Sequence, residues 1–412
     1  MNNQDADIGF LNVNVRSTRN FQPIADAKVT ISRPTTVIEV LTTDPAGQTQ
    51  TIELATPPIE YSEAVLGVKP YSEYQVSVEA QGYEKVIING VQLLPQSTAI
   101  QEIRLSALTA TDDDTSQRIV IQQHTLWGTF PPKIPEAEVK PLPDGDGFIV
   151  LSAPVIPEFM VVHLGVPDDT TAQNVWVPFK DYITNVACCE IYSTWPEQTI
   201  RANVLAILAF ALNRVYTEWY RGKGYNFTIT NSTAYDQKFD YGRNIFYNIA
   251  NIVDDIFTTY ITRPGIRQPL FTQYCDGVRV TCDGLEQWGS KDLGAAGRDA
   301  LTILRTYYGT DIYLAQADKV QGVPISYPGQ PLKIGSVGMD VRTIQTQLNS
   351  ISDSFPMIQK LRVDGIFGQN TAQAVRTFQQ IFYLPSTGVV DFATWYQISN
   401  IFVAVNRLSE FG

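Results

Sequence analysis

The stretch VPFKDYITNVACCEIYSTWPEQTIRANVLAILAFALNRV, residues 177–215, decides how the middle of this chain folds. Its apolar side chains recur every three or four residues on both sides of a short turn, which predicts two helices that pack against each other. Pro178 is suited to the first turn of the first helix. Thr194 and Glu197 have the spacing of a capping box at the start of the second helix.

A glutamate ends the apolar face of the first helix. Positions i, i+4, i+7 and i+11 share that face, and they hold Phe179, Ile183, Val186 and Glu190. We therefore expect Glu190 near the junction of the two helices. A glutamic acid that stays protonated at neutral pH can donate a proton to a glycosidic oxygen. A glutamate at a helix end can equally extend into solvent and form a surface ion pair, so position alone leaves both interpretations open.

The bulk composition of the chain excludes several classes of protein. Its 412 residues, 44% of them hydrophobic, are enough for two to four domains. The net charge of −12 and the lack of a clustered basic face argue against a nucleic-acid partner. No apolar run reaches the length of a membrane span. The N-terminal MNNQDADIGF has neither a basic nor an apolar segment, which predicts a protein made without a standard secretion signal.

Histidine is scarce, and this argues against several kinds of catalysis. His124 and His163 are the only two histidines in the sequence. Zinc hydrolases usually need two or three histidine ligands at set spacings, and Ser-His-Asp or Cys-His catalysts need a positioned histidine. The sequence therefore predicts no bound metal and no cofactor. The adjacent Cys188 and Cys189 are expected to be inert core residues.

Residues 1–105 consist of short runs that alternate apolar and polar side chains, separated by turn residues, which predicts an antiparallel β-sandwich. The order of the runs resembles the carboxypeptidase-regulatory-like sandwich, through Pro23, Ile24, Ala27, Val29, Thr43, Asp44, Gly47, Tyr74, Val76, Val78, Gly82 and Tyr83. The resemblance implies a non-catalytic module.

Residues 106–157 are rich in proline and charge, which predicts an extended, accessible linker. Accessible backbone is where proteases cut. We interpret the segment either as a plain tether or as the place of an activating cleavage between Leu108 and Pro157.

The C-terminal residues 326–412 carry the clearest motif. PLKIGSVGMDVRTIQTQLNSI (331–351) is followed by RVDGIFGQNTAQAVRTFQQIFYLPSTGVVDFATWYQI (362–398). The two stretches resemble the PG-binding-1 type of peptidoglycan-binding module, a three-helix fold. Helical periodicity supports this, because Val341, Ile344 and Leu348 share one helix face. The resemblance implies that peptidoglycan is a binding partner.

The middle residues, 158–325, resemble the SpoIID/LytB family of lytic transglycosylases. The opening matches at Val177, Pro178, Tyr182, Val186, Glu190, Trp195, Pro196, Arg201, Ala202, Ala206 and Ala209, and DGLEQWGSKDLGAAGRDALTILRTYYG (283–309) resembles the closing segment. The resemblance implies a mainly helical α+β domain in which Glu190 is the catalytic acid and base. Candidate sugar-stacking residues are Tyr192, Trp195, Tyr235 and Trp288. Candidate hydrogen-bonding residues are Gln237 and Gln287.

The chain departs from this family pattern at several positions. The family's His-Gly pair is missing, Glu286 replaces a serine and Trp288 replaces a tyrosine. Some relatives hold zinc with histidine and cysteine, and the missing histidine speaks against that metal here. Cys275 and Cys282 are expected to be free structural thiols, with a disulfide or a remnant metal site as alternatives. Asp276 and Glu286 are candidates for a second carboxylate, which would favour hydrolysis.

The order of the segments resembles the clostridial-type spore cortex-lytic enzymes. The expected fold class is therefore a multidomain α+β chain with an N-terminal antiparallel β-sandwich, a central SpoIID-like domain and a C-terminal three-helix module. The resemblance implies a zymogen stored in the cortex or coat region of the spore. It also implies activation by a subtilisin-like Csp germination protease, followed by cleavage of cortex glycan strands. The alternatives are a hydrolytic muramidase, a non-catalytic spore wall-binding protein and a zinc amidase or peptidase.

Overall fold

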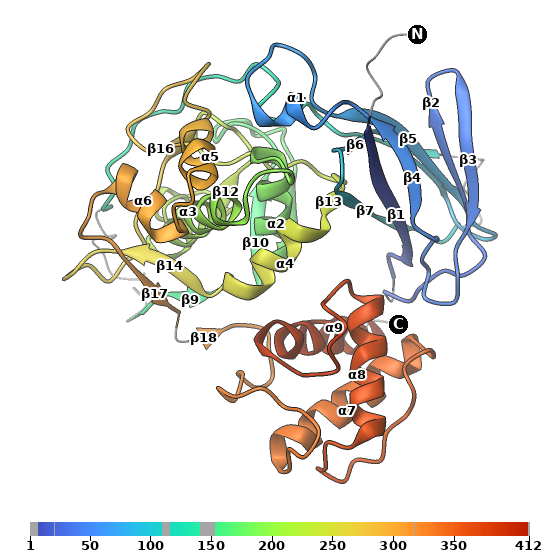
Figure 1. The fold of residues 1–412 in the computed structure, drawn as a ribbon. Helices are drawn as coiled ribbons and strands as arrows, with labels where there is room; N and C mark the ends of the chain where they lie inside the picture. The colour runs from blue at the N-terminus through green and yellow to red at the C-terminus, as the bar shows by residue number, and fades with distance from the viewer. Residues whose placement is uncertain (1–6, 20, 109–115, 141–152, 318, 411–412) are drawn as a thin grey trace.

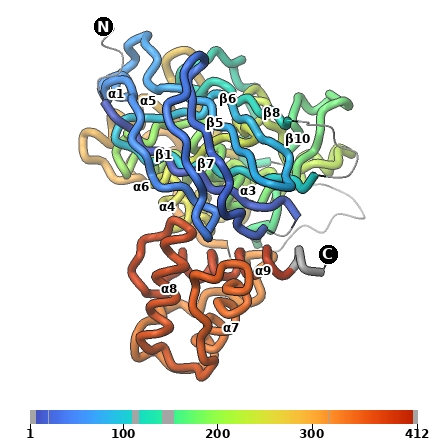
Figure 2. The backbone as a smooth tube through the Cα atoms, turned by 90° about the vertical axis from the view of Figure 1, so that its right-hand side faces the viewer, coloured from blue at the N-terminus to red at the C-terminus, as the bar shows by residue number. Residues whose placement is uncertain are grey.

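The computed structural model describes residues 7–19, 21–108, 116–140, 153–317 and 319–410. It shows a mixed α+β chain in which a β-sandwich, a largely helical body and a helical C-terminal module lie side by side (Figure 1). The three parts touch one another, and the module lies below the other two in both views (Figure 2). Within the described residues, no helix is long and apolar enough to cross a membrane.

The sandwich is built from two sheets. The strands in chain order are β1 (Asp7–Ser17), β2 (Lys28–Arg33), β3 (Thr36–Thr42), β4 (Ile52–Thr56), β5 (Ser72–Glu79), β6 (Lys85–Leu93), β7 (Thr98–Leu105) and β8 (Ser116–Val120), with the short helix α1 (Glu60–Glu63) between β4 and β5. One sheet has the order β3-β2-β5-β6-β8, and the other has the order β13-β7-β1-β4. Alternating buried side chains such as Val13, Val29 and Val76 fill the space between them.

The prediction of a purely antiparallel sandwich is wrong. β1 pairs with β7 in parallel, and β6 pairs with β8 in parallel. The chain leaves β6 in one sheet, turns at Pro95 and Gln96, and enters β7 in the other sheet beside β1. This crossing between sheets lets neighbouring strands run in the same direction, whereas hairpin connections alone would make every pair antiparallel.

The central body is organised around one buried helix. Its elements are β9 (Val155–Ile156), β10 (Phe159–His163), β11 (Asn174–Pro178), α2 (Phe179–Glu190), α3 (Glu197–Tyr216), β12 (Ile229–Thr230), β13 (Ile245–Phe246), α4 (Tyr247–Ile256), β14 (Thr259–Thr262), β15 (Tyr274–Cys275), β16 (Leu285–Glu286), α5 (Gln287–Ala295), α6 (Ala300–Tyr308), β17 (Tyr313–Gln316) and β18 (Lys319–Val320). Helix α3 is apolar nearly all round and packs against α2, α4, α5 and α6. Strand β13 leaves this body and joins the sandwich beside β7.

The start of α3 differs from the predicted capping box. The helix follows Pro196, which has an extended conformation and gives no side-chain cap. The Thr194 hydroxyl instead donates to the Ser62 hydroxyl of α1, 2.8 Å away. The Thr194 side chain therefore binds a distant part of the chain and does not cap α3 as the local pattern predicted.

The segment predicted as a free linker is tied down where the structure describes it. Residues 116–120 form β8, and residues 121–140, which we call the strap, run across the central body in irregular conformation. The Ile134 amide donates to the Ala234 carbonyl at 2.8 Å, and the Ile134 carbonyl accepts from the Gln273 side chain at 2.7 Å. The strap has irregular conformation and is bound to the body at several points.

The C-terminal module is the predicted helical fold. Its helices are α7 (Met339–Ser354), α8 (Gln369–Ile381) and α9 (Phe392–Glu410). Their apolar faces meet around a core that includes Val341, Ile344, Phe378 and Trp395. The module also touches the sandwich, because the Tyr383 hydroxyl donates to Asn12 and Asn14 of β1.

Candidate active site around Glu190

Glu190 is the last residue of α2 and its side chain is only 4% exposed. The helix stops there because Ile191 adopts an extended conformation. The apolar face of α2, with Ile183 and Val186, is fully buried and carries the glutamate into the protein. The prediction that Glu190 lies at the inner end of the apolar face is confirmed, and the alternative of a solvent-exposed surface pair is wrong.

Three segments supply hydrogen-bond donors to this carboxylate. The Lys238 amide donates to Glu190 Oε1 at 3.0 Å, and the Tyr274 hydroxyl donates to the same oxygen at 3.4 Å. The Gln287 side-chain amide donates to the Glu190 main-chain carbonyl at 2.8 Å and to Oε2 at 3.4 Å. Each carboxylate oxygen thus has a donor, so the orientation of the acid is set by groups from a loop, the strand β15 and the start of α5.

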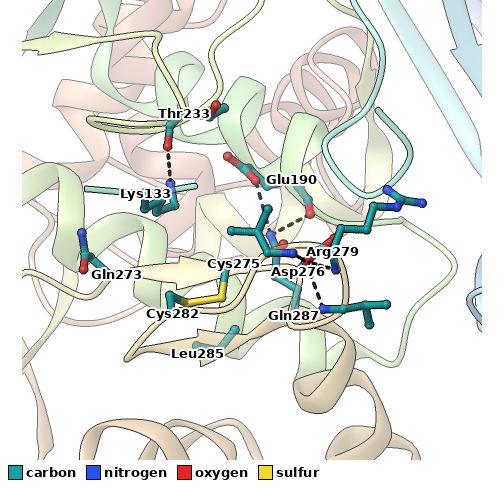
Figure 3. The surroundings of a disulfide bond; sticks show 12 residues. Lys133, Glu190, Thr233, Gln273, Cys275, Asp276, Arg279, Cys282, Leu285 and Gln287 are labelled. Atoms are coloured by element: carbon teal, nitrogen blue, oxygen red, sulfur yellow. Dashed lines mark hydrogen bonds between the residues drawn. A yellow bond between two sulfur atoms is a disulfide. The ribbon is translucent and has the colours of Figure 1, made fainter. Parts of the chain in front are cut away.

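A cavity of about 110 Å³ opens beside Glu190. The central body lines it with Glu190, Thr233, Tyr274, Cys275, Asp276, Arg279, Val280 and Gln287, and the strap lines it with Thr125, Gly128, Thr129, Phe130, Pro131 and Lys133. Figure 3 shows Glu190, Gln287, Asp276 and Arg279 gathered beside one disulfide. Pockets for small molecules usually enclose about 300 Å³ or more, so this cavity is too small for a disaccharide while the strap is in place.

Lys133 of the strap lines the cavity beside Glu190. Its ammonium donates to the main-chain carbonyls of Asp236 at 2.7 Å and Thr233 at 3.3 Å, and it lies 4.8 Å from the centre of the Tyr274 ring. Burial lowers the pKa of Lys133, and the nearby carboxyl groups of Glu190 and Asp236 partly oppose this shift. A cation of the strap is therefore held in the cavity of the candidate acid.

An ion-pair network fixes the far end of the strap. Arg214 of α3 is fully buried and donates to both carboxylate oxygens of Glu136, at 2.7 and 2.9 Å, and to Asp236 at 2.7 Å. Lys140 pairs with the same Glu136 at 2.8 Å. A buried arginine with two carboxylate partners is strongly held, so this network anchors the strap to the central body.

Cys275 and Cys282 form a disulfide, so the expectation of two free thiols is wrong. The pairing of β15 with β16 and a turn at Gly277, which has a φ of +77°, bring the two cysteines together. Asp276 braces the same loop, because its Oδ1 accepts the amides of residues 278, 279 and 280 at 2.8–3.0 Å. The loop that forms this side of the cavity is thus held by two independent interactions, the disulfide and the hydrogen bonds to Asp276.

Three of the four candidate sugar-stacking residues lie close together, and none of the four is among the described residues that line the cavity. Tyr192, Trp195 and Trp288 form one aromatic cluster, with ring centroids 5.0–6.1 Å apart. Tyr192 and Trp195 are buried, and Trp195 Nε1 donates to the main-chain carbonyl of Ser62 in α1 at 2.9 Å. The sandwich therefore covers this cluster in the intact chain. Tyr235 is half-buried and its carbonyl accepts from Arg214.

The two candidate glutamines have different surroundings. Gln287 contacts Glu190 directly and lines the cavity. Gln237 is fully buried, accepts from the Tyr182 hydroxyl at 3.1 Å and donates to the Ile207 carbonyl at 3.1 Å. The structure thus places Gln287 at the acid and Gln237 in the supporting core.

The two candidate second carboxylates are also separated by the structure. Asp276 lines the same cavity as Glu190, whereas Glu286 is absent from the described residues that line it. Asp276 Oδ1 is already occupied by three backbone amides. Of the two candidates, only Asp276 is therefore placed to act together with Glu190. In the intact chain its carboxylate holds the loop of residues 276–280 in shape.

The histidines and cysteines do not gather. His124 packs against Tyr192 with ring centroids 4.5 Å apart, and His163 contacts Asn174 at 2.8 Å. Over the described part of the chain, no group of three or more His, Cys, Asp or Glu side chains is placed to hold a metal ion. Cys188 and Cys189 are buried, and burial raises the pKa of the Cys188 thiol to about 12. Such thiols are unreactive.

Sequence reasoning missed Lys133, Arg279 and the Lys238 amide as residues of this site. Lys133 and Lys238 are 57 and 48 positions from Glu190 in the sequence, and only the fold brings them together. The signal that could have drawn attention to Arg279 is its place inside the short Cys275–Cys282 loop.

Comparison with known proteins identifies one part of the chain. Residues 337–398 match the family model described as putative peptidoglycan binding domain. No curated protein matches the chain. Among solved structures, the SleB N-terminal domain is 30% identical, with 18% of this chain and 93% of that chain covered and a TM-score of 0.16. The Bacillus anthracis TIE protein is 16% identical, with 25% of this chain and 17% of that chain covered and a TM-score of 0.18.

A third structure, Klebsiella pneumoniae 5-hydroxyisourate hydrolase, is 14% identical, with 24% of this chain and 89% of that chain covered and a TM-score of 0.18. The family match over residues 337–398 supports a peptidoglycan-binding role for the C-terminal module, with peptidoglycan as its binding partner. The C-terminal match thus points to a cell-wall-related protein, and its central body holds a buried acid beside a cavity.

Proposed function

We propose that this chain is a lytic transglycosylase that cleaves the bond between MurNAc and GlcNAc in peptidoglycan, with Glu190 as its single acid and base. The observation that carries the proposal is the buried carboxylate at the end of α2, which faces a cavity and is oriented by Gln287, Tyr274 and the Lys238 amide. The peptidoglycan-binding domain on the same chain supports the substrate. The SpoIID-like motif around Glu190 supports the reaction.

The reaction requires one carboxyl group in two successive roles. In its acid form Glu190 donates a proton to the glycosidic oxygen, and the bond from that oxygen to C1 of the muramoyl sugar breaks. As carboxylate it then accepts the proton of the C6 hydroxyl, whose oxygen bonds to C1 and closes a 1,6-anhydro ring. The proton count balances without water, and Glu190 returns to its acid form.

The neighbours of Glu190 have roles that suit this cycle. Gln287 donates to Oε2 and the Lys238 amide donates to Oε1, so both oxygens stay in fixed positions while the proton is exchanged. Because these donors belong to the body and not to the strap, they remain in place when the strap is removed. We assign them as positioning groups, and Glu190 alone as the group that exchanges protons with substrate.

We further propose that the intact chain is a zymogen of a spore cortex-lytic enzyme resembling SleC. Two observations support this: the strap forms part of the wall of the cavity beside Glu190, and α1, which follows β4 of the sandwich, contacts Trp195. A subtilisin-like Csp germination protease would cut within the predicted interval from Leu108 to Pro157. In that interval, residues 109–115 and 141–152 lie outside the described residues. The corresponding location is the cortex or coat region of the spore.

A hydrolytic muramidase is the second candidate, because Asp276 lines the same cavity and can act with water as a second carboxylate. The product distinguishes the two reactions, since hydrolysis leaves a reducing sugar and transglycosylation leaves an anhydro sugar. The non-catalytic wall-binding alternative predicts binding without any product.

The test is digestion of purified spore-cortex peptidoglycan by the full chain, by the full chain after cleavage with a subtilisin-type protease, and by Glu190→Gln after the same cleavage. Products are read by mass spectrometry. We expect anhydro-muramoyl ends from the cut protein, little product from the uncut chain and none from Glu190→Gln. Glu286→Gln is the matched control, because Glu286 does not line the cavity among the described residues. Reducing ends would establish the muramidase, and binding without cleavage would remove the enzymatic proposal.

A further inference from the structure

Arg279 is a cation at the edge of the Glu190 cavity that the proposed reaction does not use. Its side chain is exposed, and it lines the cavity together with Glu190 and Asp276. Within the described residues, its guanidinium makes one hydrogen bond, a long contact of 3.5 Å to the main-chain carbonyl of Gly128, and no ion pair. Five guanidinium donors are therefore almost unused beside the candidate acid.

The acceptor that Arg279 does contact belongs to the strap. Gly128 lies in the segment that must leave before a glycan strand can reach Glu190. Lys133, the other cation that lines the cavity, is also on the strap. Once the strap has left, Arg279 is the only positively charged side chain among the described residues that line this cavity.

The loop holds the backbone of Arg279 in place in advance of any ligand. The residue lies between Cys275 and Cys282, which are joined by a disulfide, and its amide donates to Asp276 Oδ1 at 2.9 Å. The amides on either side, of Val278 and Val280, donate to the same oxygen. Because the backbone of this loop is already fixed, the Arg279 guanidinium loses less conformational freedom on binding an anion than it would on a flexible loop.

The charges on the two partners favour a cation at this place. The chain carries a net charge of −12, and the cavity itself holds the carboxyl groups of Glu190 and Asp276. Muramoyl sugars carry carboxylates on the lactyl group or on the stem peptide attached to it. An acidic protein that binds an acidic polymer needs a local positive group at the contact, and arginine matches a carboxylate with two parallel hydrogen bonds.

We propose, building on the proposed function, that Arg279 binds a carboxylate of the muramoyl residue at the scissile bond and so sets a preference for acidic over neutral muramoyl sugars. The carboxylate comes either from the lactyl group or from the stem peptide. Arg279 would act on substrate binding, and Glu190 would carry out the chemistry.

The test uses the protease-cut full chain on three kinds of glycan strand: strands with free lactyl carboxylates, strands with stem peptides, and strands whose carboxylates are converted to methylamides. Arg279→Gln is compared with Arg279→Lys and with the exposed Arg298→Gln, which lies away from the cavity. We expect Arg279→Gln to raise KM about 10- to 100-fold on acidic strands, with kcat little changed and no effect on methylamide strands. Arg279→Lys should retain part of the affinity.

The outcomes separate the two proposals. A KM effect on bare lactyl strands assigns the lactyl carboxylate, and an effect confined to peptide-bearing strands assigns the stem. An equal loss on acidic and neutral strands would overturn the role of Arg279 while leaving the enzyme established. No cleavage of any strand by the wild-type protein would overturn the proposed function and this inference with it.

Discussion

One amide group of Gln287 donates to both the main-chain carbonyl and the carboxylate of Glu190, at 2.8 and 3.4 Å. Gln287 is the first residue of α5, and Glu190 is the last residue of α2. The contact therefore joins the ends of two helices at the acid. The resemblance implies that Gln287 binds substrate, but in the intact chain Gln287 already orients the Glu190 carboxylate.

Replacing Gln287 with alanine should lower kcat of the cut enzyme about 10- to 100-fold, with a smaller change in KM. The carboxylate would lose its Oε2 donor, so its orientation would be less fixed when it exchanges protons with substrate. The measurement is steady-state cleavage of glycan strands, with Gln373→Ala on the exposed face of α8 as the control. A change in KM alone would show that Gln287 binds substrate and does not position Glu190.

Replacing Glu136 with glutamine should weaken the hold of the strap on the body. Arg214 is fully buried and would lose its charged partner in the strap, at a cost of about 2 kcal/mol. We expect faster hydrogen exchange of the strap amides and partial activity in the uncut chain. Glu39→Gln, at an exposed position of β3, is the control. Unchanged exchange in the strap would show that other contacts hold it.

The same carboxylate gives the strap a defined pH dependence. Burial alone would raise the pKa of Glu136, but its hydrogen bonds and attraction to Arg214 and Lys140 outweigh this, so the pKa lies below its ordinary value of 4.5. A carboxyl group with a lowered pKa stabilises the folded state fully above its ordinary pKa, and the stabilisation is lost as the pH falls through the lowered value.

At pH 6 the melting temperature of the wild type should therefore be higher than that of Glu136→Gln. The difference should shrink as the pH falls below 4.5. Thermal unfolding followed by circular dichroism between pH 3 and pH 7 measures this. A difference that stays constant across the range would mean that Glu136 contributes through its shape and not through its charge.

Local patterns predicted the helices of this chain better than its long-range contacts. The periodicity of residues 179–190 predicted α2 and placed Glu190 at the end of its apolar face, because an apolar face has to meet the core. Position alone left the burial of Glu190 open, and the structure shows that the side chain is buried. The capping box predicted from the spacing of Thr194 and Glu197 is wrong, because the Thr194 hydroxyl bonds to Ser62, 132 positions away. A capping pattern describes only what a helix end can do alone, and tertiary contacts compete for the same side chain.

The candidate site likewise contains residues that the sequence predicted and residues that only the fold reveals. Glu190 and Gln287 lie in motifs that the sequence shows, and the structure brings them together. The strap residues have no motif, since a proline-rich segment looks like a tether until Arg214 is seen to hold Glu136. Aromatic residues near the acid cannot be sorted into core and cleft by type, and Trp195 proves to be covered by the sandwich in the intact chain.

The hydroxyl of Tyr383 links the C-terminal module to the sandwich through Asn12 and Asn14. Tyr383→Phe should reduce the free energy of unfolding by about 1 kcal/mol, because both amide oxygens lose their donor. A double-mutant cycle checks the assignment: in a protein that already carries Asn12→Ala and Asn14→Ala, Tyr383→Phe should have almost no further effect. Tyr313→Phe, at a largely exposed position, is the control. Additive losses would show that the hydroxyl acts elsewhere.

Two glycines of the peptidoglycan-binding domain offer a matched test of its loop. Gly365 has a φ of +76°, and an added Cβ would lie 3.0 Å from the Gly338 carbonyl oxygen. Gly368, three residues later, has a φ of −97° and open space where its Cβ would be. Gly365→Ala should therefore destabilise the domain by about 1–2 kcal/mol. Gly368 is the N-cap residue of α8, where alanine is less favourable than glycine, so Gly368→Ala should cost less, about 0.5–1 kcal/mol, through the weaker cap alone.

Hydrogen exchange of the amides in α7 and α8 measures this loss in the full chain, because it reports the local stability of the module and not that of the larger body. Binding to insoluble peptidoglycan should weaken in Gly365→Ala only as far as the folded population falls. If binding is lost while exchange in α7 and α8 stays slow, the loop that contains Asp364 and Gly365 contacts the ligand itself. In that case the left-handed backbone conformation at Gly365 serves recognition and not only the fold.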